Sequence, residues 1–450
     1  MTDHDVLLYN TDMTKVQPRR PSGFTEYLPG EQIEFNRLLA IIRTTYEKYG
    51  FAPLDTPDLE LTEVLLAKGG GETEQQVYSF KREGSDTDLT LRYDLTVPLA
   101  RYVVEHQNDL IFPFSRYHIG KVHRAERAQA GRFREFYQCD IDTIGSHSPV
   151  VDAQFPAIIN EIFEKFAFGE FTIRLNNRLI LNGFFEGIGL ASVAKDVLRI
   201  IDKMEKISRD DLIAELHKIG LDDTQVSRVL EFTAITGSND EILTQLKGLG
   251  IESEQFSDGV SKIEILIGAL RAMEVPESRF QIDLRIARGL DYYTGTVYET
   301  ILNDHPEIGS VCSGGRYDDL ANYYTDNRLP GVGISIGLTR LFYALRQNGI
   351  IDVSQQSPAD VIVVPITEEQ QTYAFEIAAA LRKAEVATTV NTEPGKLGDR
   401  LRYAGRMGFP YVIVIGGNEL EARTVSIKNM TDGNEQTVSI DEAIALLTRQ

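Results

Sequence analysis

The densest group of residues that could do chemistry lies between Lys121 and Asp142. This segment, KVHRAERAQAGRFREFYQCDID, places four arginines beside Glu126 and then alternates aromatic, amide and acidic side chains. Alternate side chains of a strand share one face, so a run of polar residues would point the same way. These residues are Arg134, Phe136, Gln138, Asp140 and Asp142. Such a face is costly as a core and suits a polar ligand, but a solvated sheet face with a charged hairpin loop remains the alternative.

Three further segments combine glycine with arginine or tyrosine. Ala287–Tyr298 (ARGLDYYTGTVY) fits a plain strand–turn–strand as well as a ligand site. Ser313–Leu320 (SGGRYDDL) predicts a tight turn that leads into a helix, and its glycines would let a ligand approach the backbone closely. Gly331–Arg340 (GVGISIGLTR) alternates small and apolar residues and ends in an arginine at the start of a helix. Taken singly, each segment is weak evidence for a site.

Composition narrows the class of protein that such a site could serve. The chain has 450 residues, which suggests about three domains. Its 67 acidic and 46 basic residues give a formal net charge of −21, so a nucleic-acid partner would have to meet local basic patches. Two cysteines, Cys139 and Cys312, are too few for a disulfide framework and speak against a zinc site. No secretory signal or membrane-length apolar run is visible, and a cytoplasmic protein is expected.

The elements that must position these segments begin with a helix at Glu31–Tyr49, where apolar residues recur at helical spacing. Phe51–Leu59 should be extended, and Pro53 and Pro57 confine it to an edge or boundary. Short runs separated by turns leave no room for crossover helices and therefore predict an antiparallel sheet. The expected strands are Gln76–Lys81, Asp88–Tyr93, Phe112–Lys121, Phe133–Ile144, Phe280–Ile286, Val297–Ile301 and Gly309–Cys312.

Two stretches depart from this pattern. Residues 182–275 carry Leu, Ile, Lys and Glu at helical periods, which indicates a helical insertion. After a polar linker at residues 351–357, the apolar runs Asp360–Pro365 (DVIVVP) and Tyr411–Ile415 (YVIVI) predict strands buried on both faces. Helices are expected near residues 369–384 and 396–407, with a short strand at 387–390 between them. This alternation predicts a small α/β domain.

In this order the segments are far more specific than any one of them. Lys121–Asp142 resembles motif 2 of the class II aminoacyl-tRNA synthetases, Gly331–Arg340 resembles motif 3, and Phe51–Leu59 is similar to their dimer-forming motif 1. Ala287–Glu299 and Gly314–Leu320 (GGRYDDL) are similar to signatures of the histidyl-tRNA synthetases. Leu91–Tyr102 (LRYDLTVPLARY) resembles the amino-acid loop of their eukaryotic-type members, and Lys396–Gly416 resembles their anticodon-binding domain. The resemblance covers essentially the whole chain.

The resemblance implies a domain order and an activity. Residues 1–181 and 276–350 would form an α+β catalytic domain built on an antiparallel sheet, interrupted by the helical insertion at 182–275. The linker at 351–357 would lead to an α/β anticodon-binding domain at 358–450. The implied enzyme is a histidine–tRNA ligase that activates L-histidine with ATP to histidyl-adenylate and transfers it to tRNA(His). The family resemblance further implies a homodimer and magnesium bound with ATP.

The same resemblance assigns the contacts with ATP. Arg124 would span the α-phosphate and the substrate carboxylate, and Arg288 would reach the α-phosphate from the opposite side; both would be catalytic. Arg340 would hold the γ-phosphate. Glu126 would accept a hydrogen bond from the edge of adenine, and Phe136 would stack on its face. Arg132 would make a further contact with ATP. Arginine suits phosphate because it stays charged and binds through two donors.

The histidine pocket follows from the resemblance in the same way. The α-amino group would meet Asp94, Thr96 and Gln138, and the imidazole would meet Asp142 and Tyr293. The remaining assigned residues of the pocket are Arg288, Tyr292 and Tyr317. A site that satisfies both ring nitrogens rejects analogues that lack them, because its own polar groups would stay unpaired. No residue is assigned as a metal ligand, since magnesium would be held largely by the phosphates.

Two features of the sequence leave alternatives open. Arg400, Arg402 and Arg406 are candidates for contact with the anticodon, but Arg402 and Arg406, four residues apart, also fit a solvated helix face. Thr339 stands where motif 3 usually carries an acid before its arginine, which puts in doubt a metal role for that position. A non-catalytic paralogue that serves as a regulatory subunit in histidine biosynthesis, or a module that senses tRNA, is the rival function. Such paralogues typically lack the anticodon-binding tail, which is present here.

Overall fold

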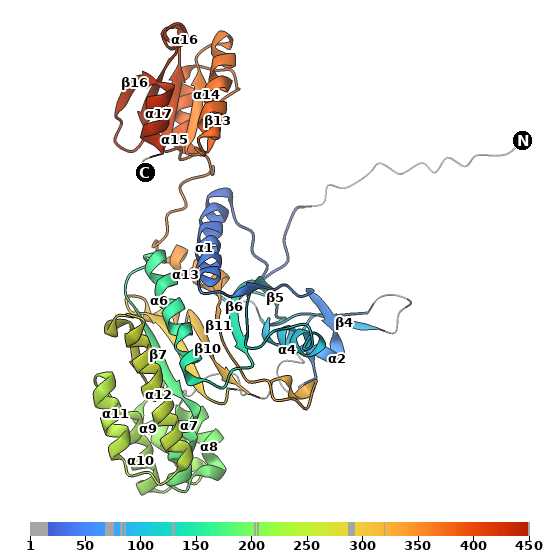
Figure 1. The fold of residues 1–450 in the computed structure, drawn as a ribbon, viewed down its shortest axis with the longest axis vertical. Coiled ribbons are helices and arrows are strands. Elements are labelled where there is room, and N and C mark those ends of the chain that lie inside the picture. The colour runs from blue at the N-terminus through green and yellow to red at the C-terminus, as the bar shows by residue number, and fades with distance from the viewer. Residues whose placement is uncertain are drawn as a thin grey trace, which may run out of the picture.

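Two sheets organise the molecule. The computed structural model describes residues 17–67, 76–81, 84, 87–127, 131–201, 204, 207–286, 293–318 and 320–448. Within these residues an eight-stranded sheet forms the centre of the larger part, and a five-stranded sheet belongs to the C-terminal part (Figure 1). The predicted plan, an α+β body followed by a small α/β unit, is confirmed.

The larger sheet is antiparallel at its centre. Its strands lie in the order β1 (Ala52–Pro53), β5 (Phe114–His123), β6 (Glu135–Ile144), β11 (Gly331–Ile336), β10 (Cys312–Tyr317), β9 (Thr296–Leu302), β7 (Phe171–Asn177) and β8 (Phe280–Ile282). Among the described strands of this sheet, only the outer pairs are parallel: β1 with β5, and β7 with β8. Strand β1 lies at an edge, as its proline content predicts.

Strand β10 corrects two expectations. The strand expected at Gly309–Cys312 and the turn into a helix expected at Ser313–Leu320 are both wrong, because Cys312–Tyr317 is a strand between β9 and β11. A Cβ atom on Gly314 would lie 2.1 Å from the carbonyl oxygen of Gly333. The glycine pair therefore marks a close approach of two strands and not a turn.

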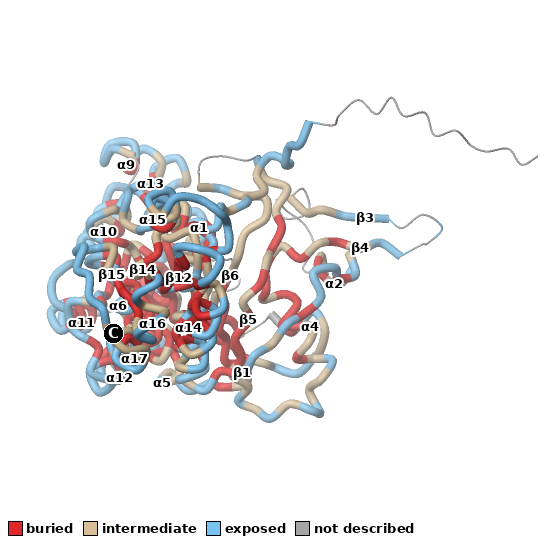
Figure 2. The backbone as a smooth tube through the Cα atoms, turned by 90° about the horizontal axis from the view of Figure 1, so that it is seen from above, coloured by how far each residue is buried: buried red, intermediate tan, exposed pale blue. Residues whose placement is uncertain are grey.

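One face of this sheet is covered by helices. Helices α1 (Pro29–Lys48), α6 (Gln154–Phe166) and α13 (Leu338–Gln347) pack their apolar residues into one core with the sheet, and α1 matches the helix predicted at Glu31–Tyr49. On β6, Cys139 and Ile141 are fully buried in that core. Because strand side chains alternate, the polar residues between them face the other side of the sheet. Figure 2 colours the chain by how far each residue is buried and shows buried residues along β5.

A smaller layer lies beside β5. It consists of a three-stranded sheet in the order β2 (Leu59–Leu61), β4 (Asp88–Leu91) and β3 (Ser79–Lys81), with the helices α2 (Thr62–Leu65) and α4 (Thr96–Glu105). The short helix α5 (Pro149–Asp152) precedes α6. The start of α4 brings the loop Leu91–Leu95 towards the large sheet, where the guanidinium of Arg116 on β5 donates to the carbonyl of Leu95.

The helical stretch between β7 and β8 shares the core of the sheet. Its helices are α7 (Arg178–Gly187), α8 (Ala194–Ile201), α9 (Arg209–Lys218), α10 (Asp223–Thr233), α11 (Asn239–Gly248) and α12 (Glu254–Ala272). The first helix of this stretch begins at Arg178. Leu243 and Leu266 belong to the same buried cluster as Ile173 and Leu175 of β7. The helical content of this region is confirmed.

The C-terminal part has its own sheet and cores. Its strands lie in the order β13 (Thr388–Val390), β12 (Val361–Pro365), β14 (Tyr411–Ile415), β15 (Thr424–Asn429) and β16 (Glu435–Ser439). The first three are parallel, and β15 and β16 add an antiparallel hairpin that the sequence pattern did not predict. The helices are α14 (Gln371–Lys383), α15 (Leu397–Arg406), α16 (Gly417–Ala422) and α17 (Ile440–Leu447). An extended segment joins this part to α13 (Figure 1).

Candidate active site

A cavity of about 650 Å³ opens over the polar face of the large sheet. Residues of β6, β9, β10 and β11 form its floor, and residues at the start of α4 form part of its wall. Every described residue to which the resemblance assigns a contact with ATP or histidine lines it: Asp94, Thr96, Arg124, Glu126, Arg132, Phe136, Gln138, Asp142, Tyr293, Tyr317 and Arg340. Arg288 and Tyr292 lie outside the described residues.

Asp142 is held from two sides. The hydroxyl of Tyr317 donates to its Oδ1 at 2.6 Å, and Nη2 of Arg116 lies 2.7 Å from its Oδ2. Burial raises the pKa of the Asp142 carboxyl, while the Arg116 guanidinium and the Tyr317 hydroxyl oppose that rise. The carboxylate is thereby fixed in orientation at the cavity wall, as an acceptor for an N–H group must be.

Two glycines of motif 3 make room for this pair. A Cβ atom on Gly333 would lie 2.1 Å from Oδ1 of Asp142, and a Cβ atom on Gly331 would lie 2.4 Å from the ring of Tyr317. The glycines of GVGISIG thus leave the space that the side chains of Asp142 and Tyr317, on neighbouring strands, occupy. This explains in physical terms why a glycine-rich strand sits at the floor of the cavity.

Buried oxygen atoms near Asp142 lack partners. Oε1 of Gln138 and Oδ1 of Asp140 make no hydrogen bond among the described residues, although Nε2 of Gln138 donates to Ser335 Oγ at 2.8 Å. Burial raises the pKa of Asp140 to about 7. Asp94 accepts the backbone N–H of Val97 at 3.1 Å, and burial raises its pKa as well. Buried acceptors without partners are costly, so this end of the cavity suits a ligand with several N–H donors.

Arginines gather at the other end. The guanidinium of Arg124 donates from Nε to the carbonyl of Tyr93 at 3.1 Å and lies 5.2 Å from the centre of the Phe136 ring. Burial and the nearby Arg132 guanidinium lower the pKa of Arg340, whose Nη2 donates to the carbonyl of Ile308. The two guanidinium groups of Arg132 and Arg340 repel each other, and an anion bound beside them would offset this repulsion. This end therefore suits the phosphates of a nucleotide.

Glu126 and Thr339 differ in their relation to the cavity. Glu126 lines it, with Oε2 3.8 Å from Nη1 of Arg132. Thr339 is 3% exposed, is not among the lining residues, and accepts the backbone N–H of Tyr137 at 2.8 Å through Oγ1. The threonine that replaces the usual acid of motif 3 thus ties α13 to β6.

Sequence reasoning missed several residues of the site. Ser335, Gly333 and Glu299 line the cavity, and Arg116 lies behind Asp142. Polar alternation along the predicted strand Phe112–Lys121 is the signal that would have singled out Arg116. Arg134, which was expected on the same face as Phe136, is not among the lining residues, because it precedes β6 and its Nε donates to the carbonyl of Glu126 at 2.9 Å.

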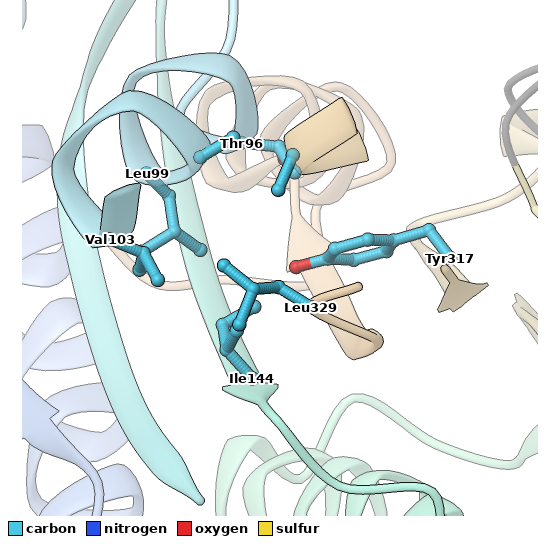
Figure 3. A pocket seen from close by; sticks show the side chains of 8 residues that line it. Thr96, Leu99, Val103, Ile144, Tyr317 and Leu329 are labelled. Atoms are coloured by element: carbon cyan, nitrogen blue, oxygen red, sulfur yellow. The ribbon is translucent and has the colours of Figure 1, made fainter. Parts of the chain in front are cut away.

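A second, water-sized cavity of about 10 Å³ lies behind Tyr317. Its wall is largely apolar. Figure 3 draws the residues that line it and labels Thr96, Leu99, Val103, Ile144, Tyr317 and Leu329. Leu99 and Val103 come from α4, whose first residue, Thr96, also lines the large cavity. Tyr317 thus separates an apolar space from the polar site.

The three arginines proposed for the anticodon belong to α15. Nη1 of Arg402 lies 2.7 Å from Oδ1 of Asp399, Arg400 donates to the carbonyl of Pro365, and Arg406 is exposed. Arg402 and Arg406 are thus solvent-accessible on one helix. This agrees both with contact to the anticodon and with a merely solvated helix face. In the described part of the chain no three His, Cys, Asp or Glu residues come together as metal ligands. None of its described helices is long and apolar enough to cross a membrane.

Fold and site together define a class of protein. A central antiparallel sheet that carries an arginine-rich hairpin, an acidic pocket and a closing strand–helix unit with Arg340 is the arrangement of a class II aminoacyl-tRNA synthetase. A protein-family model described as histidyl-tRNA synthetase matches residues 23–341, and one described as an anticodon binding domain matches residues 360–450. The chain therefore belongs to the histidyl-tRNA synthetase family.

Individual relatives agree with this family. The protein named histidine–tRNA ligase from Clostridium tetani is 52% identical over 435 residues, which cover 96% of this chain and 98% of that protein. The crystal structure of histidyl-tRNA synthetase from Nostoc sp. PCC 7120 is 42% identical, has a TM-score of 0.91, and is matched over 97% of this chain and 100% of that one. A structure described as an ATP phosphoribosyltransferase regulatory subunit/histidyl-tRNA synthetase from Bacillus halodurans C shares the fold at a TM-score of 0.72 and 19% identity, over 90% of this chain and 99% of that one.

Proposed function

We propose that the large cavity is the site at which this member of the family joins L-histidine to ATP before charging tRNA(His). The observation that carries the proposal is the separation of charge within one cavity. All six charged residues line the cavity: Asp94, Asp140 and Asp142 lie near one another, Arg132 and Arg340 lie near one another, and Arg124 lies near Asp94. Histidine brings N–H donors and positive charge to the acidic end, and ATP brings phosphates to the arginines.

In the first step an oxygen of the histidine carboxylate attacks the α-phosphorus of ATP. A new O–P bond forms, the bond to the β-phosphate breaks, and pyrophosphate leaves with the electron pair. Arg124 stabilises both anions as they approach, and Arg340 holds the leaving end; Arg288 is assigned to the opposite side of the α-phosphate. Fixed positive charge in a site shielded from water is effective because it needs no reorganisation during the reaction.

The remaining assigned residues orient the substrates. Gln138 and Asp94 accept from the α-amino group, together with Thr96, and Asp142 and Tyr293 face the imidazole. Glu126 and Phe136 recognise adenine, for which the Arg124 guanidinium must leave the ring face that it now covers. In the second step a terminal ribose hydroxyl of the tRNA attacks the activated carbonyl carbon, and AMP leaves.

Magnesium is expected with ATP and supplies charge neutralisation at the phosphates when bound. A carboxylate on the cavity wall fits an ion that arrives with the nucleotide, because magnesium prefers oxygen ligands. Glu299 lines the cavity and would supply such an oxygen.

For the rest of the molecule we propose the division at 1–181 and 276–350, 182–275, 351–357 and 358–450. The C-terminal unit would bind the anticodon through Arg400, Arg402 and Arg406. The resemblance of Phe51–Leu59 to motif 1 implies a homodimer. A cytoplasmic location is proposed from the sequence composition. Sedimentation at micromolar concentration should give about twice the 50.5 kDa chain mass, and an active monomer would rule the dimer out.

The test of the activity is pyrophosphate exchange with each of the twenty amino acids. Exchange with histidine alone is expected, and exchange with none would favour a regulatory or tRNA-sensing paralogue. The presence of the anticodon-binding unit, which such paralogues were expected to lack, supports the ligase. So do Arg124 and Arg340, which both line the cavity.

A further inference from the structure

Arg116 is a fully buried arginine immediately behind the histidine pocket. It lies on β5 directly opposite Asp142 of β6 and is 0% exposed. Its Nη2 is 2.7 Å from Oδ2 of Asp142 and also donates to the carbonyl of Leu95 at 3.2 Å. Its Nε and Nη1 make no hydrogen bond among the described residues. A buried guanidinium is expensive, so its position calls for a reason.

The guanidinium joins the two segments that carry the proposed histidine ligands. Asp142 is on β6, whereas Leu95 lies between Asp94 and Thr96 at the start of α4. One planar group that contacts both segments fixes their separation. Arg116 itself is not among the residues that line the cavity, so it would act through its neighbours.

The charges around Arg116 are mostly negative. Its guanidinium favours ionisation of Asp94, Asp140 and Asp142, against the burial that raises the pKa of each. The other facing groups are Tyr317 on β10 and Ser335 on β11, which donate to these acids, and Arg124, which acts on Asp94. His118, the next residue of β5 on this face, adds no charge near neutrality, because burial and two arginines lower its pKa to about 3.

We propose that Arg116 is a positioning residue of the histidine pocket, which holds the Asp142 carboxylate charged and aimed at the imidazole and so sets the affinity for histidine without touching it. This inference rests on the proposed function of the cavity. It predicts an effect confined to histidine, because Arg116 contacts Asp142 and Leu95, the latter between Asp94 and Thr96. A merely structural Arg116 would instead affect both substrates and stability alike.

The experiment compares Arg116→Gln and Arg116→Lys with wild type in histidine-dependent pyrophosphate exchange across pH 5.5–9. Arg116→Gln should raise KM for histidine roughly tenfold to a hundredfold, as expected for a disturbed buried charge pair, while KM for ATP stays within about twofold. Loss of the guanidinium raises the pKa of Asp142, so the acid limb of kcat/KM for histidine should move about one unit towards higher pH. Arg116→Lys, which keeps the charge, should recover part of the loss.

A double-mutant cycle tests whether the effect runs through Asp142. In an Asp142→Asn background, Arg116→Gln should cause little further change in KM for histidine. This double variant removes Arg116 together with its ion-pair partner Asp142, so it keeps the test open if Arg116→Gln alone fails to fold. The matched control is Arg279→Gln, a partly buried arginine that, like its partner Glu170, is not among the lining residues. It should lower the melting temperature without moving the acid limb.

Two results would overturn the inference. One is an unchanged KM for histidine and an unmoved acid limb in Arg116→Gln; the other is an equal rise in KM for both substrates that Lys does not relieve. Failure of the proposed function would be visible earlier and separately, as wild-type protein that shows no histidine-dependent exchange.

Discussion

At the scale of single residues, the pocket depends on atoms that are absent as much as on those present. Gly333 lies opposite Asp142 on the neighbouring strand, and any side chain there would occupy the place of the carboxylate. The contact between Asp142 and Tyr317 is therefore possible because Gly331 and Gly333 of β11 have no Cβ atom.

Gly333→Ala should displace the Asp142 carboxylate, because the new Cβ would lie 2.1 Å from Oδ1. KM for histidine in pyrophosphate exchange should rise about tenfold or more, which corresponds to at least about 1.4 kcal/mol of binding free energy. The matched control is Gly268→Ala on the exposed side of α12, where a Cβ meets nothing within 4 Å. That control should leave KM unchanged and stabilise the protein slightly. An unaltered KM in Gly333→Ala would show that the strand yields and the carboxylate does not.

Arg288 belongs to the signature ARGLDYYTG and lies outside the described residues. If it stabilises charge that builds up on the α-phosphate, Arg288→Ala should lower kcat of exchange about a hundred- to a thousandfold, with a modest change in KM for histidine. Added guanidinium should restore part of the rate. Arg402→Ala in α15 serves as the control and should exchange normally. Near wild-type exchange by Arg288→Ala would make this arginine structural.

At the scale of elements, one hydrogen bond joins the helix of motif 3 to the strand of motif 2. Thr339 of α13 accepts the backbone N–H of Tyr137 on β6, and the ring of Tyr137 packs against Phe35 of α1. Thr339, which stands where the resemblance to motif 3 predicts an acid, thus connects the elements that present Arg340 and Gln138 to the cavity.

Thr339→Val keeps the shape of the side chain and removes the acceptor. The buried N–H of Tyr137 would lose its partner, which should cost about 1–3 kcal/mol of unfolding free energy in denaturant titration. KM for ATP should stay within about twofold, because Thr339 is not a lining residue. Thr244→Val, on an exposed face of α11, should change stability by less than about 0.5 kcal/mol. A large loss of ATP affinity without loss of stability would assign Thr339 to the nucleotide site instead.

The sequence predicted these elements unevenly, for physical reasons. The period-two alternation of β6 correctly placed Gln138, Asp140 and Asp142 on one face, because a strand has only two faces. The same reasoning failed at Ser313–Tyr317, since a glycine pair signals a turn and a close approach of strands equally well. Polar alternation could have placed Arg116 on the polar face of its strand, but its pairing with Asp142 depends on the register between β5 and β6, which no local pattern specifies.

At the scale of the whole molecule, charge and connection explain how an acidic protein can serve a nucleic acid. The net charge is −21, yet α15 exposes Arg402 and Arg406 on a unit joined to the body by an extended segment. Local positive charge on that unit is what the phosphate backbone would meet. The cavity proposed as the active site lies in the other unit.

Truncation after Gln356 should spare exchange and greatly reduce tRNA charging. Gln356 accepts the backbone N–H of Gly30 and would remain, so the body keeps that contact. Loss of a second binding unit removes its avidity, and charging at limiting tRNA should fall roughly a hundredfold. Aminoacylation and exchange measured on the same preparation decide the matter. Equal loss of both activities would show that the C-terminal unit supports folding or the active site.

The shared core of the helices between β7 and β8 has a consequence for thermal unfolding. Leu266 of α12 is fully buried in one cluster with Ile173 of β7, whereas Ile413 of β14 is buried in a separate cluster of the C-terminal unit. Groups that share a core lose it together, so these helices should melt with the catalytic body as one cooperative unit. Calorimetry should then resolve two transitions, with Leu266→Ala shifting the one that accompanies loss of exchange and Ile413→Ala shifting the other. The helical stretch is an insertion in the chain, but we expect it to unfold as part of the catalytic body.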